Sequence, residues 1–319
     1  MNELAKQKIE KIKQGKFGVE VEMYNIRRRD AAYALGELWN TSDSVDDLGG
    51  YYNKWCVKDR KGRRWEFMSD SSISDGWGGC EMVTPLLEYE DIELLQEAIR
   101  HLRHKGAGSD PTHDCGVHIH VDVADFNAKQ LLNLTNLVAS HEALIKDAIS
   151  VTEDRRRWCK ATHPQFLKEV NRIKPRTVQE FRKVFYESQG FDEDEACTHY
   201  SDTRYYLLNF HSLWQNKGVE FRCFQFANPT GDRRGGLHAG EMKSYIQLCL
   251  ALVEMARSVN GAKSVPSRAQ ADNPQYAMKR FIRRLGLKGG EFKTVRDVMF
   301  KNLEGNARVR RVDLVRETA

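Results

Sequence analysis

Three short segments of this chain alternate strictly between aliphatic side chains and charged or metal-ligating ones. In the first, FGVEVEM, the aliphatic residues alternate with Glu20 and Glu22. Because successive side chains of a β-strand point to opposite faces, the two carboxylates share one face at a spacing of about 7 Å. An ordinary amphipathic strand would also alternate, although neighbouring like charges on a sheet cost free energy. The segment therefore predicts a strand with one apolar and one anionic face.

Further segments repeat this design. In CGVHIHVDV, His118 and His120 project to one face, and in VEFRCF, Glu220 and Arg222 do the same. A shorter segment, CEMVTP, places Glu81 between apolar residues just before a proline that ends the strand. Taken singly, each has a simpler interpretation: a structural histidine pair, a cross-strand ion pair or a solvated glutamate. Taken together, they predict that several strands present ligating side chains to one side of a sheet.

Such convergence predicts a site for divalent cations. The four carboxylates of Glu20, Glu22, Glu81 and Glu220 would repel one another and have raised pKa values without a counter-charge, whereas divalent cations would hold them ionised. Oxygen-dominated ligation favours magnesium over zinc, and an added imidazole favours manganese or a borderline site.

The remaining pattern predicts an α+β fold. The strands do not alternate one-for-one with helices, and the turn signal at residues 59–62 indicates a hairpin, so we expect a mostly antiparallel sheet backed by helices. Residues 152–204 are polar and weakly helical, which indicates a helical insertion or flap. The predicted strands are 18–23, 55–57, 65–67, 80–83, 115–123, 205–210 and 219–224, and the predicted helices are 90–103, 127–150 and 238–257.

The charge is unevenly distributed. The chain has a net charge of +5, yet residues 257–319 carry 15 lysines and arginines against 6 acidic residues. We therefore divide the chain into a body, 1–256, and a basic C-terminal extension, 257–319, which begins at the polar SVNGAKSVPS connection. The extension would either face phosphates or an acidic partner, or form a solvated helix face with a loose terminus. The overall charge does not require nucleic acid as a partner.

No run of apolar residues is long enough to cross a membrane, and the N-terminal MNELAKQKIEKIKQ has the charges of an exposed helix. We predict a cytoplasmic protein without a membrane partner. The seven cysteines form no C-x-x-C pair, so we expect most to be buried apolar residues rather than disulfides or zinc ligands.

Several familiar nucleotide and hydrolase motifs are absent. The chain has no G-x-x-x-x-G-K-[ST], G-x-G-x-x-G, H-E-x-x-H or G-x-S-x-G segment. A bound nucleotide would then be held by metal ions and by arginines, whose planar guanidinium group grips phosphate with two hydrogen bonds. The candidates are Arg222, Arg204 and Arg157.

The segments GVEVE, DSSIS with CEMVTPLL, CGVHIHVD, RRRWC, and RYYLLNFHSL with VEFRCF occur in an order that resembles the amidoligase family of carboxylate–amine ligases, which is related to glutamine synthetase and glutamate–cysteine ligase. The resemblance covers roughly residues 16–256. It implies a catalytic domain like theirs, with a sheet-lined cleft where magnesium or manganese ions bridge the phosphates of ATP. A carboxylate would become an acyl phosphate before an amine attacks it.

The resemblance also implies roles for individual residues. The implied metal ligands are Glu20, Glu22, Glu81, His118 and Glu220. The implied nucleotide contacts are His120 and Arg222, and Arg204 is a further candidate for binding the nucleotide. Glu81, Glu220 and Arg222 are the catalytic candidates. Asp70, Ser72, Arg157 and Asn209 match positions on the substrate side. The residues do not identify a general base, for which Asp114 and Glu81 are the candidates.

The predicted function is therefore an ATP-dependent ligase that joins a small-molecule or peptide carboxylate to an amine. Three alternatives stay open at this point: a phosphotransferase related to guanidino kinases, a metal-dependent hydrolase, and a non-catalytic binding protein that uses the basic extension. The identity of the substrates, the physiological metal, the oligomeric state and the role of the extension do not follow from the sequence.

Overall fold

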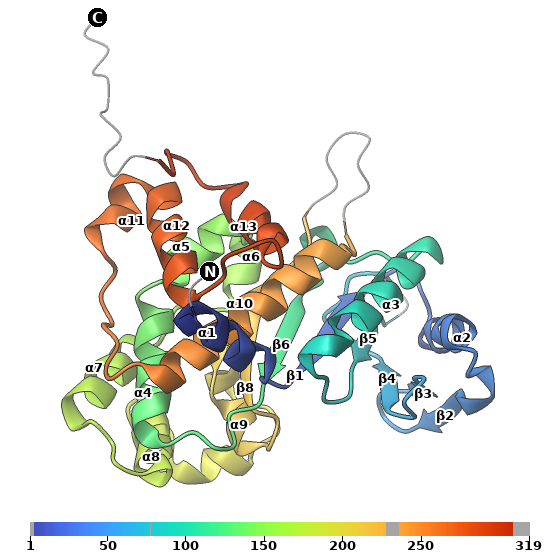
Figure 1. Ribbon diagram of the computed structural model, residues 1–319. Helices are drawn as coiled ribbons and strands as arrows, with labels where there is room; N and C mark the ends of the chain where they lie inside the picture. The colour runs from blue at the N-terminus through green and yellow to red at the C-terminus, as the bar shows by residue number, and fades with distance from the viewer. Residues whose placement is uncertain (1–2, 77, 228–235, 309–319) are drawn as a thin grey trace, which may run out of the picture.

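An antiparallel sheet of eight strands forms the centre of the molecule (Figure 1). The computed structural model describes residues 3–76, 78–227 and 236–308. The strand order is β2-β3-β4-β5-β1-β6-β8-β7, and all these neighbours pair antiparallel. The strands are β1 (Phe17–Met23), β2 (Asp46–Gly49), β3 (Lys54–Lys58), β4 (Arg64–Met68), β5 (Cys80–Val83), β6 (Val117–Val121), β7 (Leu208–Asn209) and β8 (Val219–Phe224).

Helices surround this sheet. The α-helices are α1 (Glu3–Lys13), α2 (Arg28–Trp39), α3 (Ile92–His104), α4 (Ala128–Ala139), α5 (Glu142–Ala148), α6 (Glu153–Arg156), α7 (Pro164–Ile173), α8 (Val178–Glu187), α9 (His211–Trp214), α10 (Ala239–Ser258), α11 (Arg268–Asp272), α12 (Pro274–Leu285) and α13 (Lys293–Phe300). The 3₁₀ turns are η1 (Ser42–Ser44), η2 (Tyr89–Asp91), η3 (Pro111–His113), η4 (Glu193–Cys197) and η5 (Asp202–Arg204).

Helix α10 is the main support of the sheet. It is mostly buried and contacts β6 together with α3 and α4, while α1 and α13 lie beside it (Figure 1). The aliphatic side chains of β1, such as Val19 and Val21, point into this core and are almost fully buried. Burying a side chain of this size contributes about 1.5–3 kcal/mol. One face of β1 is thereby fixed, and Glu20 and Glu22 must point to the opposite face.

The predicted α+β class and antiparallel sheet are confirmed. The predicted hairpin is the β3–β4 pair, in which the carboxylate of Asp59 accepts the backbone N–H groups of Lys61 and Arg63 at 2.8 and 3.0 Å. The finer prediction, a catalytic domain like those of glutamine synthetase and glutamate–cysteine ligase, stays a prediction.

Some predicted elements have different bounds. The single helix predicted for residues 127–150 is two helices, because His141 leaves the helical region at φ −131° and its ring lies 2.9 Å from the carbonyl oxygen of Leu137. The strand predicted for residues 205–210 is reduced to β7. Strand β2 and helix α2 were not predicted.

The predicted insertion, 152–204, and the predicted C-terminal extension, 257–319, both contain helices. Residues 152–204 contain α6, α7, α8, η4 and η5, and α7 and α8 pack against α4. Beyond residue 257, α12 buries Met278, Phe281 and Leu285. The interpretation of 152–204 as an insertion or flap, and the division of the chain at 256/257, stay predictions. Within the described ranges, no helix is both long and apolar enough to span a membrane.

Candidate active site

The register of the sheet brings the predicted ligands together. In the centre, β1 pairs with β5 on one side and β6 on the other, so Glu20 lies opposite His118 and Glu22 lies opposite Glu81. On the next strand, Glu220 of β8 lies opposite His120 of β6. Four strands from distant parts of the chain thus contribute to one side-chain cluster, on the face opposite the aliphatic core.

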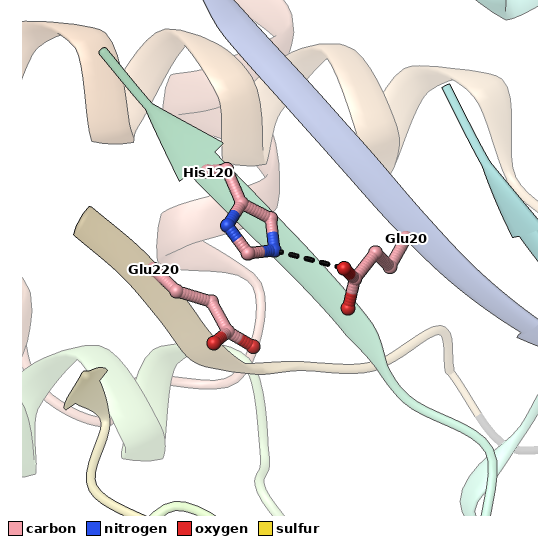
Figure 2. A group of neighbouring side chains, drawn as sticks. All are labelled: Glu20, His120 and Glu220. Carbon is pink, nitrogen blue, oxygen red and sulfur yellow. Dashed lines mark ion pairs between the residues drawn. The ribbon is translucent and has the colours of Figure 1, made fainter. Parts of the chain in front are cut away.

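One group of possible ligands comes from β1, β6 and β8. Figure 2 shows Glu20, His120 and Glu220 converging from these three strands. Nε2 of His120 lies 3.2 Å from Oε1 of Glu20, and one ligand atom from each of the three residues lies within 4.8 Å of the others. This spacing suits three ligands of a single metal ion.

Two further groups continue from the first, each sharing one residue with the group before it. They are Glu20 with Glu81 and His118, and Glu22 with Asp70 and Glu81, and their ligand atoms also lie within 4.8 Å of one another. Because Glu20 and Glu81 each belong to two groups, the three groups form one continuous row. The row combines carboxylate oxygens, which suit magnesium and manganese, with imidazole nitrogens, which favour manganese or another borderline metal.

Glu220 is the most firmly held of these carboxylates. Nη1 of Arg222 donates to its Oε1 at 2.5 Å, and Nδ2 of Asn209, which lies opposite Glu220 on β7, donates to its Oε2 at 2.6 Å. Burial raises the pKa of Glu220, but Arg222 and the histidines outweigh burial and hold that pKa at about 2. Glu220 is therefore ionised at neutral pH.

The local backbone accounts for the position of Arg222. Between Phe221 and Phe224 the β6–β8 pairing shifts register, so β8 carries an additional residue there. Such a bulge redirects a side chain and is frequent beside active sites. The Arg222 guanidinium is buried, and its Nε has no hydrogen-bond partner in the described part of the chain.

Glu81 has the opposite environment. Burial raises the pKa of its carboxyl, and the charges of Glu20, Glu22 and Asp70 raise it further, to well above the ordinary value. Glu20 differs, because His120 and His118 outweigh its burial and leave its pKa well below the ordinary value. No cationic side chain pairs directly with Glu81 among the described residues, and the charge of Arg222 only partly offsets its acidic neighbours.

This imbalance fits a bound divalent cation. Five carboxylates gather in the row, and the arginines that contact them are Arg222 and Arg155. Both ring nitrogens of His120 are also buried without a hydrogen bond among the described residues, since the contact with Glu20 has the distance of an ion pair but not the direction of a hydrogen bond. A metal ion would neutralise the carboxylates and give the imidazole a partner.

A comparison with known families decides the assignment. Residues 13–253 match the family described as "Putative amidoligase enzyme". The chain belongs to the amidoligase family. This confirms the family predicted from the order of the sequence motifs. None of the curated proteins matches the chain in sequence.

A solved structure is similar to this amidoligase family member over most of its length. It is a bifunctional glutathione synthetase from Pasteurella multocida, with 12% identity and a TM-score of 0.46. The similarity covers 94% of this chain and 48% of the glutathione synthetase chain. The chain therefore spans about half the length of that enzyme.

The predicted substrate-side residues of the amidoligase are more dispersed. Asp70 belongs to the ligand row, and its Oδ1 accepts the backbone N–H of Ser72 at 2.8 Å, while Ser72 itself is exposed. Arg157 is 63% exposed and lies over the ring of Trp158. The side chain of Asn209 donates a hydrogen bond to Glu220 and accepts one from the backbone N–H of His211. Of these four predicted residues, Asp70 joins the carboxylate row, Asn209 contacts it through its side chain, and Ser72 contacts it through its backbone N–H.

Arg204 lies beside the row rather than in it. Its guanidinium stacks over the rings of Tyr200 and Tyr205, and the Tyr205 ring also faces Arg222 at 5.9 Å. The hydroxyl of Tyr200 in turn hydrogen-bonds that of Tyr52, in the turn between β2 and β3. Because β2 and β7 form opposite edges of the sheet, this contact joins segments from both sides of the site.

The sequence interpretation missed one residue. Arg155 is buried, and its Nη1 lies 3.6 Å from Oε2 of Glu22. The RRRWC segment contains Arg155, but the sequence analysis predicts a role for Arg157 instead. Three consecutive arginines look equivalent in sequence, and only the short helix α6 determines which one points inward.

Proposed function

We propose that this chain is an ATP-dependent carbon–nitrogen ligase that converts a carboxylate into an acyl phosphate and then transfers the acyl group to an amine. The observation that carries the proposal is the row of carboxylate and imidazole groups on four strands and on the loop that carries Asp70. Family membership supports the same class of reaction. The substrates would be a small-molecule or peptide carboxylate and an amine.

The reaction explains why such a row is needed. A carboxylate is a poor acyl donor because its leaving group would be oxide, and transfer of a phosphoryl group from ATP supplies a better one. Bound Mg²⁺ or Mn²⁺ would neutralise the phosphate oxygens and so lower the barrier to attack by an anion. The residues proposed to hold the metal are Glu20, Glu22, Glu81, His118 and Glu220, with Asp70 and His120 beside them.

Arg222 is proposed to bind the transferred phosphoryl group. Glu220 fixes its guanidinium through Nη1, while the buried Nε still lacks an acceptor among the described residues. A phosphate oxygen is an acceptor of the right charge, and a prepositioned guanidinium stabilises charge that develops during transfer. Arg204, stacked on the Tyr205 ring that Arg222 also faces, would extend this positive surface toward the nucleotide.

Thermal unfolding with a non-hydrolysable ATP analogue tests this proposal. With Mg²⁺ present, analogue at 100 times its dissociation constant stabilises the fold by about 2.7 kcal/mol. We expect this shift to require Mg²⁺ and to disappear in Glu220→Gln, while Glu153→Gln, an exposed carboxylate on α6, retains it. A wild-type protein without a metal-dependent shift would contradict the proposal.

The products separate the ligase from its alternatives. With ATP, metal and both substrates, a ligase releases free phosphate together with an amide. A stable phosphorylated product would instead indicate a phosphotransferase, and amide cleavage that is independent of ATP would indicate a hydrolase.

A further inference from the structure

Arg155 is the second arginine that contacts the ligand row. It lies in α6, at the start of the 152–204 segment, and is 2% exposed. Its Nη1 donates to the backbone carbonyl of Asp114 at 2.9 Å and lies 3.6 Å from Oε2 of Glu22. The same Glu22 oxygen accepts the backbone N–H of Gly116 at 2.5 Å. Two neighbours thus fix one oxygen of Glu22.

The guanidinium of Arg155 lies directly against the backbone of Gly116. A Cβ atom at position 116 would lie 1.9 Å from Nη2 and 2.5 Å from Cζ of Arg155. Contacts this short do not occur, so any side chain at 116 would displace the guanidinium. Gly116 is therefore required for the close approach of Arg155 and not for an unusual backbone conformation.

Arg155 also stabilises the loop that carries Asp70. The residue that it binds, Asp114, accepts the hydroxyl of Ser74 through its side chain at 2.8 Å, and the backbone of Ser74 binds the carbonyl of His113. Ser74 belongs to the same loop as Asp70. Arg155 thus contacts Glu22 directly and reaches the Asp70 loop through one intermediate residue.

These two carboxylates belong to the one ligand group that contains no histidine. That group is Glu22, Asp70 and Glu81. Removing charged side chains from water is costly unless they are paired, so three buried or half-buried carboxylates need a fixed positive charge nearby. Arg155 supplies that charge at this end of the row, as Arg222 does at the Glu220 end.

We infer that Arg155 is a positioning residue, which holds Glu22 and the Asp70 loop in the orientation that binds a divalent cation. The inference rests on the proposed function, because it assumes that the row binds metal. Arg155 is not itself a metal ligand, because its guanidinium stays protonated and offers no lone pair to a cation. Changes to residues that orient metal ligands typically reduce metal affinity 10–100-fold.

Binding of Mn²⁺ alone, measured by calorimetry, tests the inference. Arg155→Lys keeps the charge but loses the planar group that spans Asp114 and Glu22. Gly116→Ala keeps Arg155 but displaces its guanidinium. We expect each variant to weaken Mn²⁺ binding about tenfold or more. The Mn²⁺ affinity of the double variant should be no lower than that of the single variant that binds less tightly, because both changes remove the same contact.

The matched control is Arg156→Lys, because Arg156 is a half-exposed neighbour that pairs with Glu153 and Asp147. It should bind Mn²⁺ as the wild type does. Unfolding midpoints without metal establish that each variant is folded, and if Arg155→Lys does not fold, Gly116→Ala carries the test. Mn²⁺ affinity within twofold of wild type in the folded variants would overturn the role of Arg155. A wild-type protein that binds no Mn²⁺ would instead overturn the metal site of the proposed function.

Discussion

Glu81 differs from the other glutamates of the site because no cationic side chain pairs with it in the described ranges. Its neighbours Glu20, Glu22 and Asp70 are all acidic, and burial together with these neighbours raises its pKa. Residues kept in such unfavourable surroundings are often functional, because proteins accept a loss of stability at their sites.

Replacement of Glu81 by glutamine should therefore separate stability from metal binding. We expect Glu81→Gln to raise the metal-free unfolding free energy by about 0.5–2 kcal/mol, because the substitution relieves repulsion without changing shape. It should also abolish the stabilisation by Mn²⁺, since Glu81 belongs to two of the three ligand groups. Thermal unfolding with and without Mn²⁺ measures both effects. A variant that is less stable than wild type without metal, or equally stabilised by it, would refute this account of Glu81.

At the scale of elements, the β3–β4 hairpin is tied to the start of α3 by a buried ion pair. Asp91 accepts from Arg63 at 2.5 and 3.1 Å and from Lys61 at 2.7 Å, and Asp91 is 2% exposed. Burial raises the pKa of Asp91, but Arg63 and Lys61 outweigh burial and leave it well below the ordinary value. These ion pairs thus fix the β3–β4 hairpin, which lies on the β5 side of the ligand row.

This depressed pKa predicts a particular dependence of stability on pH. A carboxyl whose pKa is lower in the folded state stabilises the fold above its unfolded pKa, about 3.9, and this contribution is lost as the pH falls below that value. At pH 7 we expect Asp91→Asn to cost about 1.5–3 kcal/mol, because it leaves the partly buried Arg63 with one charged partner fewer. The difference from wild type should shrink between about pH 4 and pH 2.

Urea unfolding at several pH values measures this difference. Asp43→Asn, at an exposed position in η1, is the control and should behave as wild type does. A difference between Asp91→Asn and wild type that stays constant from pH 7 to pH 2 would argue against the ion pair.

The strands of the site can be predicted from the sequence, but the pairing between them cannot. Strict alternation predicts the faces of β1, β6 and β8, because a period of two determines which side chains share a face. Which strands become neighbours depends on long-range pairing, and Glu20 meets a histidine 98 residues away. The inward direction of Arg155 depends on α6, a helix of 4 residues with no hydrophobic periodicity.

At the scale of the whole molecule, the fold places a buried helix behind one face of the sheet and charged side chains on the other. Helix α10 packs against β6, the neighbour of β1, and the aliphatic side chains of β1 are buried in the core, so the carboxylates cannot rotate into it. The contact between Tyr52 and Tyr200 joins segments from both edges of the sheet. The α+β class can be predicted from the sequence pattern. The contact between Tyr52 and Tyr200 cannot, because the two residues lie far apart in the chain and no local sequence pattern indicates their pairing.

Calorimetric binding of a non-hydrolysable ATP analogue to wild type and to Glu20→Gln, each with and without Mg²⁺, tests the central claim most directly. Glu20 is one of the two carboxylates on the central strand β1, and it belongs to two ligand groups. We predict that wild type binds the analogue with Mg²⁺ and at least about tenfold more weakly without it, and that Glu20→Gln loses this dependence on metal. Equal affinity with and without Mg²⁺ in the wild type, or an unchanged metal effect in Glu20→Gln, would contradict a metal-bridged nucleotide site on this sheet.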